Sequence, residues 1–303
     1  MTIADKLDLA IKLKETGTTD GAYVIERGNS VKYSKKTYMT KEEWKAFEAD
    51  MKANDLQPNA HTEYSKGGGD ELTEKNGRPP KMASYGSSSR MIYNLSRNKA
   101  GFHYEKKLST SVGGTANLDG FCNEENRYIF VEAKCREPYS KKNNSVSTAY
   151  KELYDYINIK TAGSMKISMI PSKCGRYMNV DYFAGDEKLE HFDIKQMICH
   201  LLGIATGLLK GILERKQIDF IYLLYDPTEL DMESNAKAQI DRIYERTCYE
   251  CNLVDFSELF CVILNFLRAE KYAGAVSDDE IDEMILKFTF SLASQELYPI
   301  LLP

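Results

Sequence analysis

Two carboxylates and a lysine lie close together within residues 117–136. Glu132 follows Asp119 by thirteen residues, and Lys134 follows Glu132 by two. Carboxylate oxygens are the ligands that hard divalent cations take, and Mg²⁺ needs only one or two of them beside its waters. A lysine next to such a cation can orient a water molecule or take a proton from it. These residue types together indicate metal-assisted hydrolysis.

Two strands joined by a tight turn are expected to position these side chains. Residues 116–122 and 127–135 are predicted as strands, and the polar residues 123–126 as the turn between them. Alternate residues of a strand share a face. One face of the second strand therefore carries Tyr128, Phe130, Glu132 and Lys134, and the other, predicted to be core, carries Ile129, Val131, Ala133 and Cys135.

The expected register places the two carboxylates on one face. A turn centred on Glu124 and Glu125 pairs Asp119 with Phe130. Glu132 is then the diagonal neighbour of Asp119, at a backbone distance of roughly 7–8 Å. Two carboxylates at this separation can share one cation.

The segments GGTANLDGF and FVEAKCREPYS, which contain these residues, resemble the signature of the PD-(D/E)xK nuclease superfamily. They resemble more closely a group of bacterial restriction endonucleases within it. The resemblance covers residues 85–230, and the chain departs from the signature in having Leu118 before the aspartate. It implies an α/β fold with an αβββαβ core, in which helices flank a mixed sheet. It also implies that Asp119, Glu132 and the Ala133 carbonyl hold Mg²⁺, or Mn²⁺ in its place, and that Lys134 positions the attacking water.

Three further residues are candidates for the same site. Glu105 lies on a predicted strand, and an extra acid near the first strand often assists metal binding in this superfamily; a salt bridge to Lys106 is the alternative. Gln196 and His200 are four residues apart and share a face of a predicted helix. Some members of the superfamily carry Gln-x-x-x-Tyr on this helix, and here His200 stands in place of the tyrosine. A buried core residue is the alternative role for His200.

Other polar residues near the motif are open to two interpretations. Arg136, Lys141 and Lys142 follow the second strand and are expected either to contact the DNA backbone or to lie in a solvated loop. Cys248 and Cys251 have the spacing of half a zinc site, but no second pair follows, so we expect a structural role.

The charge of the chain is unevenly distributed. The 303 residues carry a net charge of −5, with −1 in residues 1–80, +8 in residues 81–180 and −12 in residues 181–303. The positive third contains the motif, as expected of a surface that faces a polyanion. A solvated basic face is the alternative.

Composition excludes several other classes of protein. A hydrophobic content of 43% is typical of a soluble globular protein, and no apolar run approaches the roughly 20 residues of a membrane span. The amphipathic start does not have the pattern of a secretory signal, and seven scattered cysteines favour a reducing compartment, so we expect a cytoplasmic protein. No phosphate-binding loop or dinucleotide fingerprint is present, so no nucleotide cofactor is expected.

Three regions are predicted along the chain: an N-terminal α+β accessory module and linker (1–80), the nuclease core (81–230) and a C-terminal helical extension (231–303). The linker stretch 56–87 is expected to be a loop or a flap over the cleft, and residues 160–190 are expected to be irregular. Helices are predicted at 3–15, from Thr40, at 90–98, 148–158 and 194–213, and in three later segments, 233–250, 255–269 and 277–288; a hairpin is predicted at 23–34 and strands at 101–112 and 218–227.

These patterns predict a Mg²⁺-dependent DNA endonuclease of restriction or defence type. A double-strand cut needs two active sites, so we expect a homodimer or paired binding events, and a restriction–modification role would add a cognate methyltransferase. Two alternatives remain open: a repair or recombination nuclease that acts on DNA ends or junctions, and a DNA-binding module with a silent site. A hydrolase or transferase acting on a small substrate is disfavoured by the positive middle third.

Overall fold

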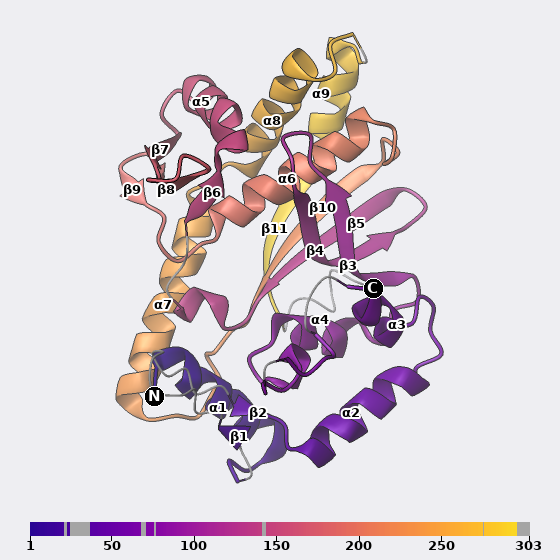
Figure 1. The fold of residues 1–303 in the computed structure, drawn as a ribbon, viewed down its shortest axis with the longest axis vertical. Helices are drawn as coiled ribbons and strands as arrows, with labels where there is room; N and C mark the ends of the chain where they lie inside the picture. Colours follow the sequence, from indigo (N-terminus) through magenta and orange to yellow (C-terminus); the bar gives the residue numbers. More distant parts are fainter. Residues whose placement is uncertain are drawn as a thin grey trace.

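The structure is a computed structural model that describes residues 1–20, 23–24, 37–67, 71–75, 77–140, 144–274 and 276–295. It has a mixed α/β architecture built on a mixed five-stranded sheet, with nine α-helices in the described part (Figure 1). None of the described helices has the length and apolar composition needed to cross a membrane. The predicted α/β class with a mixed central sheet is thus confirmed.

The central sheet combines an antiparallel and a parallel half. Its order is β11-β10-β5-β4-β3. Strands β3, β4 and β5 pair antiparallel, while β5, β10 and β11 pair parallel. The bounds are β3 (Phe102–Ser109), β4 (Thr115–Asn123), β5 (Arg127–Lys134), β10 (Gln217–Leu224) and β11 (Phe288–Ser294).

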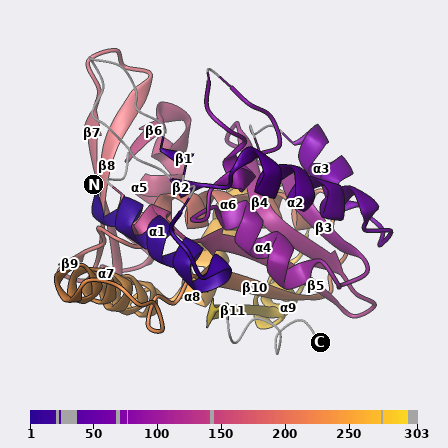
Figure 2. The same cartoon turned by 90° about the horizontal axis from the view of Figure 1, so that it is seen from below.

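Helices cover both faces of this sheet (Figures 1 and 2). Helices α6 (Ile194–Leu209) and α8 (Phe256–Glu270) enclose one core, to which β5 contributes Phe130. Helices α1 (Ile3–Thr16) and α4 (Ser88–Ser96) enclose the other, to which β5 contributes Val131. The expectation of one core face on β5 is therefore too narrow, because every residue from Tyr128 to Lys134 is buried.

The N-terminal region packs directly on the sheet. Helices α2 (Lys41–Ala53) and α3 (Ala60–Lys66) share the second core with α1 and α4. The prediction of a loop at 56–87 is wrong in part, because α3 and the short helix η1 (Lys81–Ala83) form there and fully bury Met82 and Ala83. Strand β1 (Tyr23–Val24) pairs with β2 (Thr37–Tyr38), whereas the second strand of the predicted hairpin lies outside the described residues.

A second sheet flanks the main one. It contains β6 (Ser145–Ser147), β7 (Met165–Pro171), β8 (Tyr177–Ala184) and β9 (Glu187–Lys188), and α5 (Lys151–Lys160) packs against β7. The expectation of irregular structure at 160–190 is therefore wrong. The strand period is present there, because Met165 and Ile167 are buried while Lys166 between them is exposed.

The C-terminal helices form as predicted, together with one unexpected strand. Helix α7 (Ser234–Asn252) precedes α8, and α9 (Asp278–Leu286) opens with the expected capping box between Ser277 and Glu280. The predicted helix end near 288 is wrong by two residues, because β11 begins at Phe288 and runs parallel to β10.

Helix α6 lies against β3 and β4 without room for another atom at Gly203. A Cβ there would lie 2.6 Å from the Cβ of Ala116 and 3.2 Å from that of Leu108. Glycine to alanine normally stabilises a helix by about 1 kcal/mol. We predict that Gly203→Ala instead destabilises the protein by about 1–3 kcal/mol, because the helix must move off the sheet.

Urea unfolding measures this effect. Gly207→Ala is the comparison, because a Cβ at Gly207 meets only the side chain of Leu213. A stability equal to or above the wild type for Gly203→Ala would contradict the packing described.

Candidate active site

The two strands that carry the motif separate at Asp119. Strands β4 and β5 pair from Asn123 with Tyr128 up to Gly120 with Val131, and no pair follows. The predicted partner of Phe130 was Asp119, but the observed partner is Phe121, so the predicted register is wrong by two residues. A shift of two does not by itself move a side chain to the other face, because the strand period is two.

The turn explains the shift. The backbone N–H of Glu124 donates to the carbonyl of Arg127 at 2.9 Å, and the Arg127 guanidinium donates to the Glu124 carboxylate at 2.7 Å. The loop is therefore closed between these two residues and centred between Glu125 and Asn126, one residue beyond the predicted centre.

A break in side-chain alternation turns Asp119 toward β5. Leu118 packs in the core beneath α6, yet the position of Gly120 faces Phe102 and Val131 on the opposite side. Asp119, between them, accepts a hydrogen bond from the backbone N–H of Ala133 at 2.8 Å. The carboxylate thus satisfies a backbone donor of β5 at the point where the two strands part.

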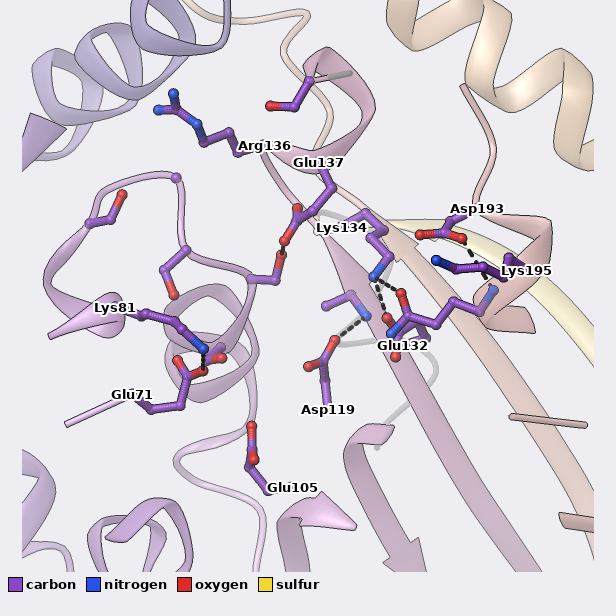
Figure 3. Close-up of a pocket in the computed structure, with 18 of the residues that line it drawn as sticks. Glu71, Lys81, Glu105, Asp119, Glu132, Lys134, Arg136, Glu137, Asp193 and Lys195 are labelled. Atoms are coloured by element: carbon purple, nitrogen blue, oxygen red, sulfur yellow. Dashed lines mark hydrogen bonds and ion pairs between the residues drawn. The ribbon is translucent and has the colours of Figure 1, made fainter. Parts of the chain in front are cut away.

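Glu132 and Lys134 form a buried ion pair beside Asp119 (Figure 3). Lys134 Nζ donates to Glu132 Oε1 and, at 2.7 Å, to Oε1 of Gln196 on α6. The second oxygen of Glu132 lies 2.8 Å from Nε2 of His200, within ion-pair distance but without hydrogen-bond alignment. Gln196 and His200, one helical turn apart on α6, therefore contact the lysine and the carboxylate respectively.

Asp119, Glu132, Lys134 and Gln196 line a cleft of about 620 Å³. Its walls also carry Glu105 and an ion pair of 3.1 Å between Glu71 and Lys81 (Figure 3). Glu105 adopts a left-handed backbone conformation with φ of 56°, rare for a residue with a Cβ. Sequence reasoning missed Glu71 and Lys81, because no motif marks them in the stretch predicted as a loop.

The electrostatics of the two carboxylates differ sharply. Burial and the nearby Glu132 charge raise the pKa of Asp119 well above its usual value. Burial also acts to raise the pKa of Glu132, but Lys134 and His200 outweigh it and lower that pKa. Burial would lower the pKa of Lys134, whereas the attraction of Glu132 and Glu137 raises it well above its usual value. The cleft therefore holds one ionised pair and a second carboxyl that ionises reluctantly.

The donor set fits a cation that keeps most of its waters. Within the described ranges, no group of three or more His, Cys, Asp or Glu side chains could enclose a metal ion. Asp119 and Glu132 are two carboxylates, and Mg²⁺ is typically bound by one or two. Burial and Glu71 raise the pKa of Glu105, which lines the same cleft. The cleft therefore contains carboxyl groups whose ionisation is unfavourable. A bound cation would favour their ionised forms.

Arg136 does not lie in the solvated loop that was one of its two expected positions, and contact with DNA stays a prediction. It is 9% exposed, and its guanidinium binds Asp5 at 2.6 Å and also Asp8, both on α1. Gly86 permits this approach, because a Cβ there would overlap Asp8. Arg136 therefore joins α1 to the end of β5, at the wall of the cleft. Lys141 and Lys142 lie outside the described residues.

The structure gathers most of the predicted site residues in one place. Asp119, Glu132, Ala133, Lys134 and Gln196 converge where β4 and β5 part, and Glu105 lines the same cleft. Comparison of the chain with protein-family models, curated proteins and solved structures found no match.

The raised pKa of Asp119 gives a pH dependence of stability. Unfolded aspartate ionises near pH 4. Above that pH the folded state retains a proton that the unfolded state has lost, so wild-type stability falls as the pH rises toward the folded pKa. We predict that Asp119→Asn, which keeps an acceptor for Ala133, gains stability over wild type as the pH rises.

Thermal unfolding in a chelating buffer from mildly acidic to mildly alkaline pH measures this difference. An advantage of the variant that stays constant or shrinks with rising pH would contradict the electrostatics described.

His200 compensates the buried charge of Glu132. Replacing it with leucine removes the ring nitrogen that lies 2.8 Å from the buried Oε2 of Glu132 and puts a methyl group in its place. We predict a loss of about 1–3 kcal/mol of stability for His200→Leu and a smaller loss for His200→Gln, which restores a donor. Urea unfolding compares them, and equal losses would show that only packing at this position matters.

Proposed function

We propose that this protein is a metal-dependent nuclease that hydrolyses phosphodiester bonds of DNA, built on a PD-(D/E)xK core. The observation that carries the proposal is the convergence of Asp119, Glu132 and Lys134 where two strands part at the edge of an open cleft. The order α4-β3-β4-β5-α6-β10 also supports it, because it follows the αβββαβ pattern once the second sheet and α5, inserted between β5 and α6, are set aside.

Asp119 and Glu132 would hold the divalent cation, Mg²⁺ or Mn²⁺. When bound, the cation polarises the phosphodiester and lowers the pKa of a water. Asp119 contributes a carboxylate already fixed in direction by the Ala133 N–H. Glu132 contributes an ionised carboxylate whose two oxygens face Lys134 and His200.

Lys134 positions the attacking water and supports the developing negative charge. An ammonium group has three donors. Glu132 and Gln196 accept two of them, which fixes the direction of the group at the wall of the cleft. Donors held in place before the reaction stabilise transition-state charge more effectively than mobile ones. Water attacks opposite the leaving 3′ oxygen. The proton that the attacking water loses passes to solvent, and a solvent water protonates the leaving oxygen to a hydroxyl.

The open shape of the cleft and the net charge of the segment that carries the motif favour a large anionic substrate. The cleft is open, and Lys81 and Lys195 lie on its walls among the acids. Residues 81–180 carry a net charge of +8. A restriction or defence role, cleavage by a homodimer and a cognate methyltransferase follow from the resemblance of the motif segments and belong to the same proposal.

Cleavage of supercoiled plasmid tests the proposal. We expect wild-type protein to nick or linearise it with Mg²⁺ or Mn²⁺ and not with a chelator. Asp119→Ala and Lys134→Ala should slow cleavage at least about a hundredfold, because each removes a group that acts on the reacting atoms.

Glu270→Ala and Lys271→Ala are the matched controls, since both residues are exposed at the far end of α8. Both methylated and unmethylated plasmid are needed, because a restriction enzyme would distinguish them. Cleavage at the wild-type rate by both Asp119→Ala and Lys134→Ala, or no cleavage of either plasmid by the wild type, would overturn the proposal.

A further inference from the structure

Strands β7 and β8 form a hairpin that projects from the body of the protein (Figure 2). We call residues 165–184 the arm. One face of the arm joins the core through residues such as Ile167 and Val180. The alternate residues of the two strands form the other face, which carries Ile170 and Tyr177 and is open to solvent.

Two large apolar side chains stand together near the end of the arm. Ile170 is 60% exposed and Tyr177 is 50% exposed. Ile170 pairs with Asn179, so Tyr177, two residues away on β8, is its diagonal neighbour on the same face. Adjacent exposed residues of this size at a projecting tip indicate a contact surface.

The turn at the tip of the arm is positively charged. Residues 156–180 contain four basic residues and no acidic one. Asp181, which lies on the open face farther from the tip, is paired with Lys188 at 2.9 Å. Lys173 and Arg176 lie in the turn at the tip and are exposed, and no ion pair joins either to an acid of the described residues. A surface with apolar side chains between unopposed cations complements a polyanion that also offers apolar groups.

The arm is continuous with the catalytic cleft. Asn144 lines the cleft, and its carbonyl accepts a hydrogen bond from the N–H of Val180 at 3.1 Å. The next residues form β6, which pairs with β8 from Asn179 to Tyr177. A long substrate that leaves the cleft past Asn144 would therefore run along the open face of the arm.

We infer that the arm is a DNA-contacting element that grips the duplex beside the scissile phosphate. A two-stranded ribbon has the width that the major groove admits. Lys173 and Arg176 bind phosphates on the groove walls, and Ile170 and Tyr177 contact base edges or methyl groups. This inference rests on the proposed nuclease function and adds the position and mode of duplex binding.

The test measures binding and cleavage separately. A labelled DNA duplex is titrated in chelating buffer at several salt concentrations with wild type and with Lys173→Ala/Arg176→Ala. Loss of two phosphate contacts should weaken binding and reduce the slope of log affinity against log salt by about 2. Ile170→Ser/Tyr177→Ser should weaken binding without changing that slope, because neither residue is charged.

Lys210→Ala/Lys271→Ala is the matched control, since both lysines are exposed and lie at the C-terminal ends of α6 and α8. It should leave the affinity and the slope unchanged. Wild-type cleavage of plasmid with affinity and slope unchanged in both arm variants would overturn the role of the arm and leave the nuclease standing. Normal DNA binding with loss of a wild-type dimer in light scattering would assign the surface to a second copy and also overturn the inference. A wild type that neither binds nor cleaves DNA would overturn both proposals.

Discussion

The structure depends on one hydrogen bond in the central sheet, in which a side-chain carboxylate takes the place of a backbone carbonyl. Where β4 and β5 would continue their ladder, the Asp119 carboxylate takes the N–H of Ala133. This contact satisfies a buried backbone donor, as the interior of a protein requires. It also opens the sheet, so that a carboxylate of β4 lies beside the charged pair of β5. The cleft exists because the two strands part here.

The site beside the parted strands contains charged side chains that are buried, and burying a charge is energetically unfavourable. Glu132 is completely buried, and an unpaired ion there would be strongly unfavourable. Helix α6 meets this need with two residues four positions apart, Gln196 for the lysine and His200 for the carboxylate. The close contact at Gly203 fixes the position of α6 on the central sheet. The packing of α6 on the sheet therefore also fixes the positions of the two side chains that contact the buried charges.

Local patterns predicted the hairpin, the helix caps and the three central residues, because alternation and capping act over a few positions. The register came out two residues wrong, since the Glu124–Arg127 contacts that close the turn are not visible in residue types alone. The buried ion pairs of Arg136 were not predicted because its partners, Asp5 and Asp8, lie far away in sequence. Glu71 and Lys81 were missed for the same reason. The strands of the arm were missed despite a clear period-two pattern, so that error was one of interpretation.

Direct measurement of cation binding tests the central claim that the parted strands form a metal site. Titration of Mn²⁺ followed by electron paramagnetic resonance reports bound metal without requiring activity or DNA. The account predicts saturable binding in the wild type that is lost in Asp119→Ala and retained in Glu270→Ala. Equal binding by wild type and Asp119→Ala would place any metal elsewhere and contradict the account.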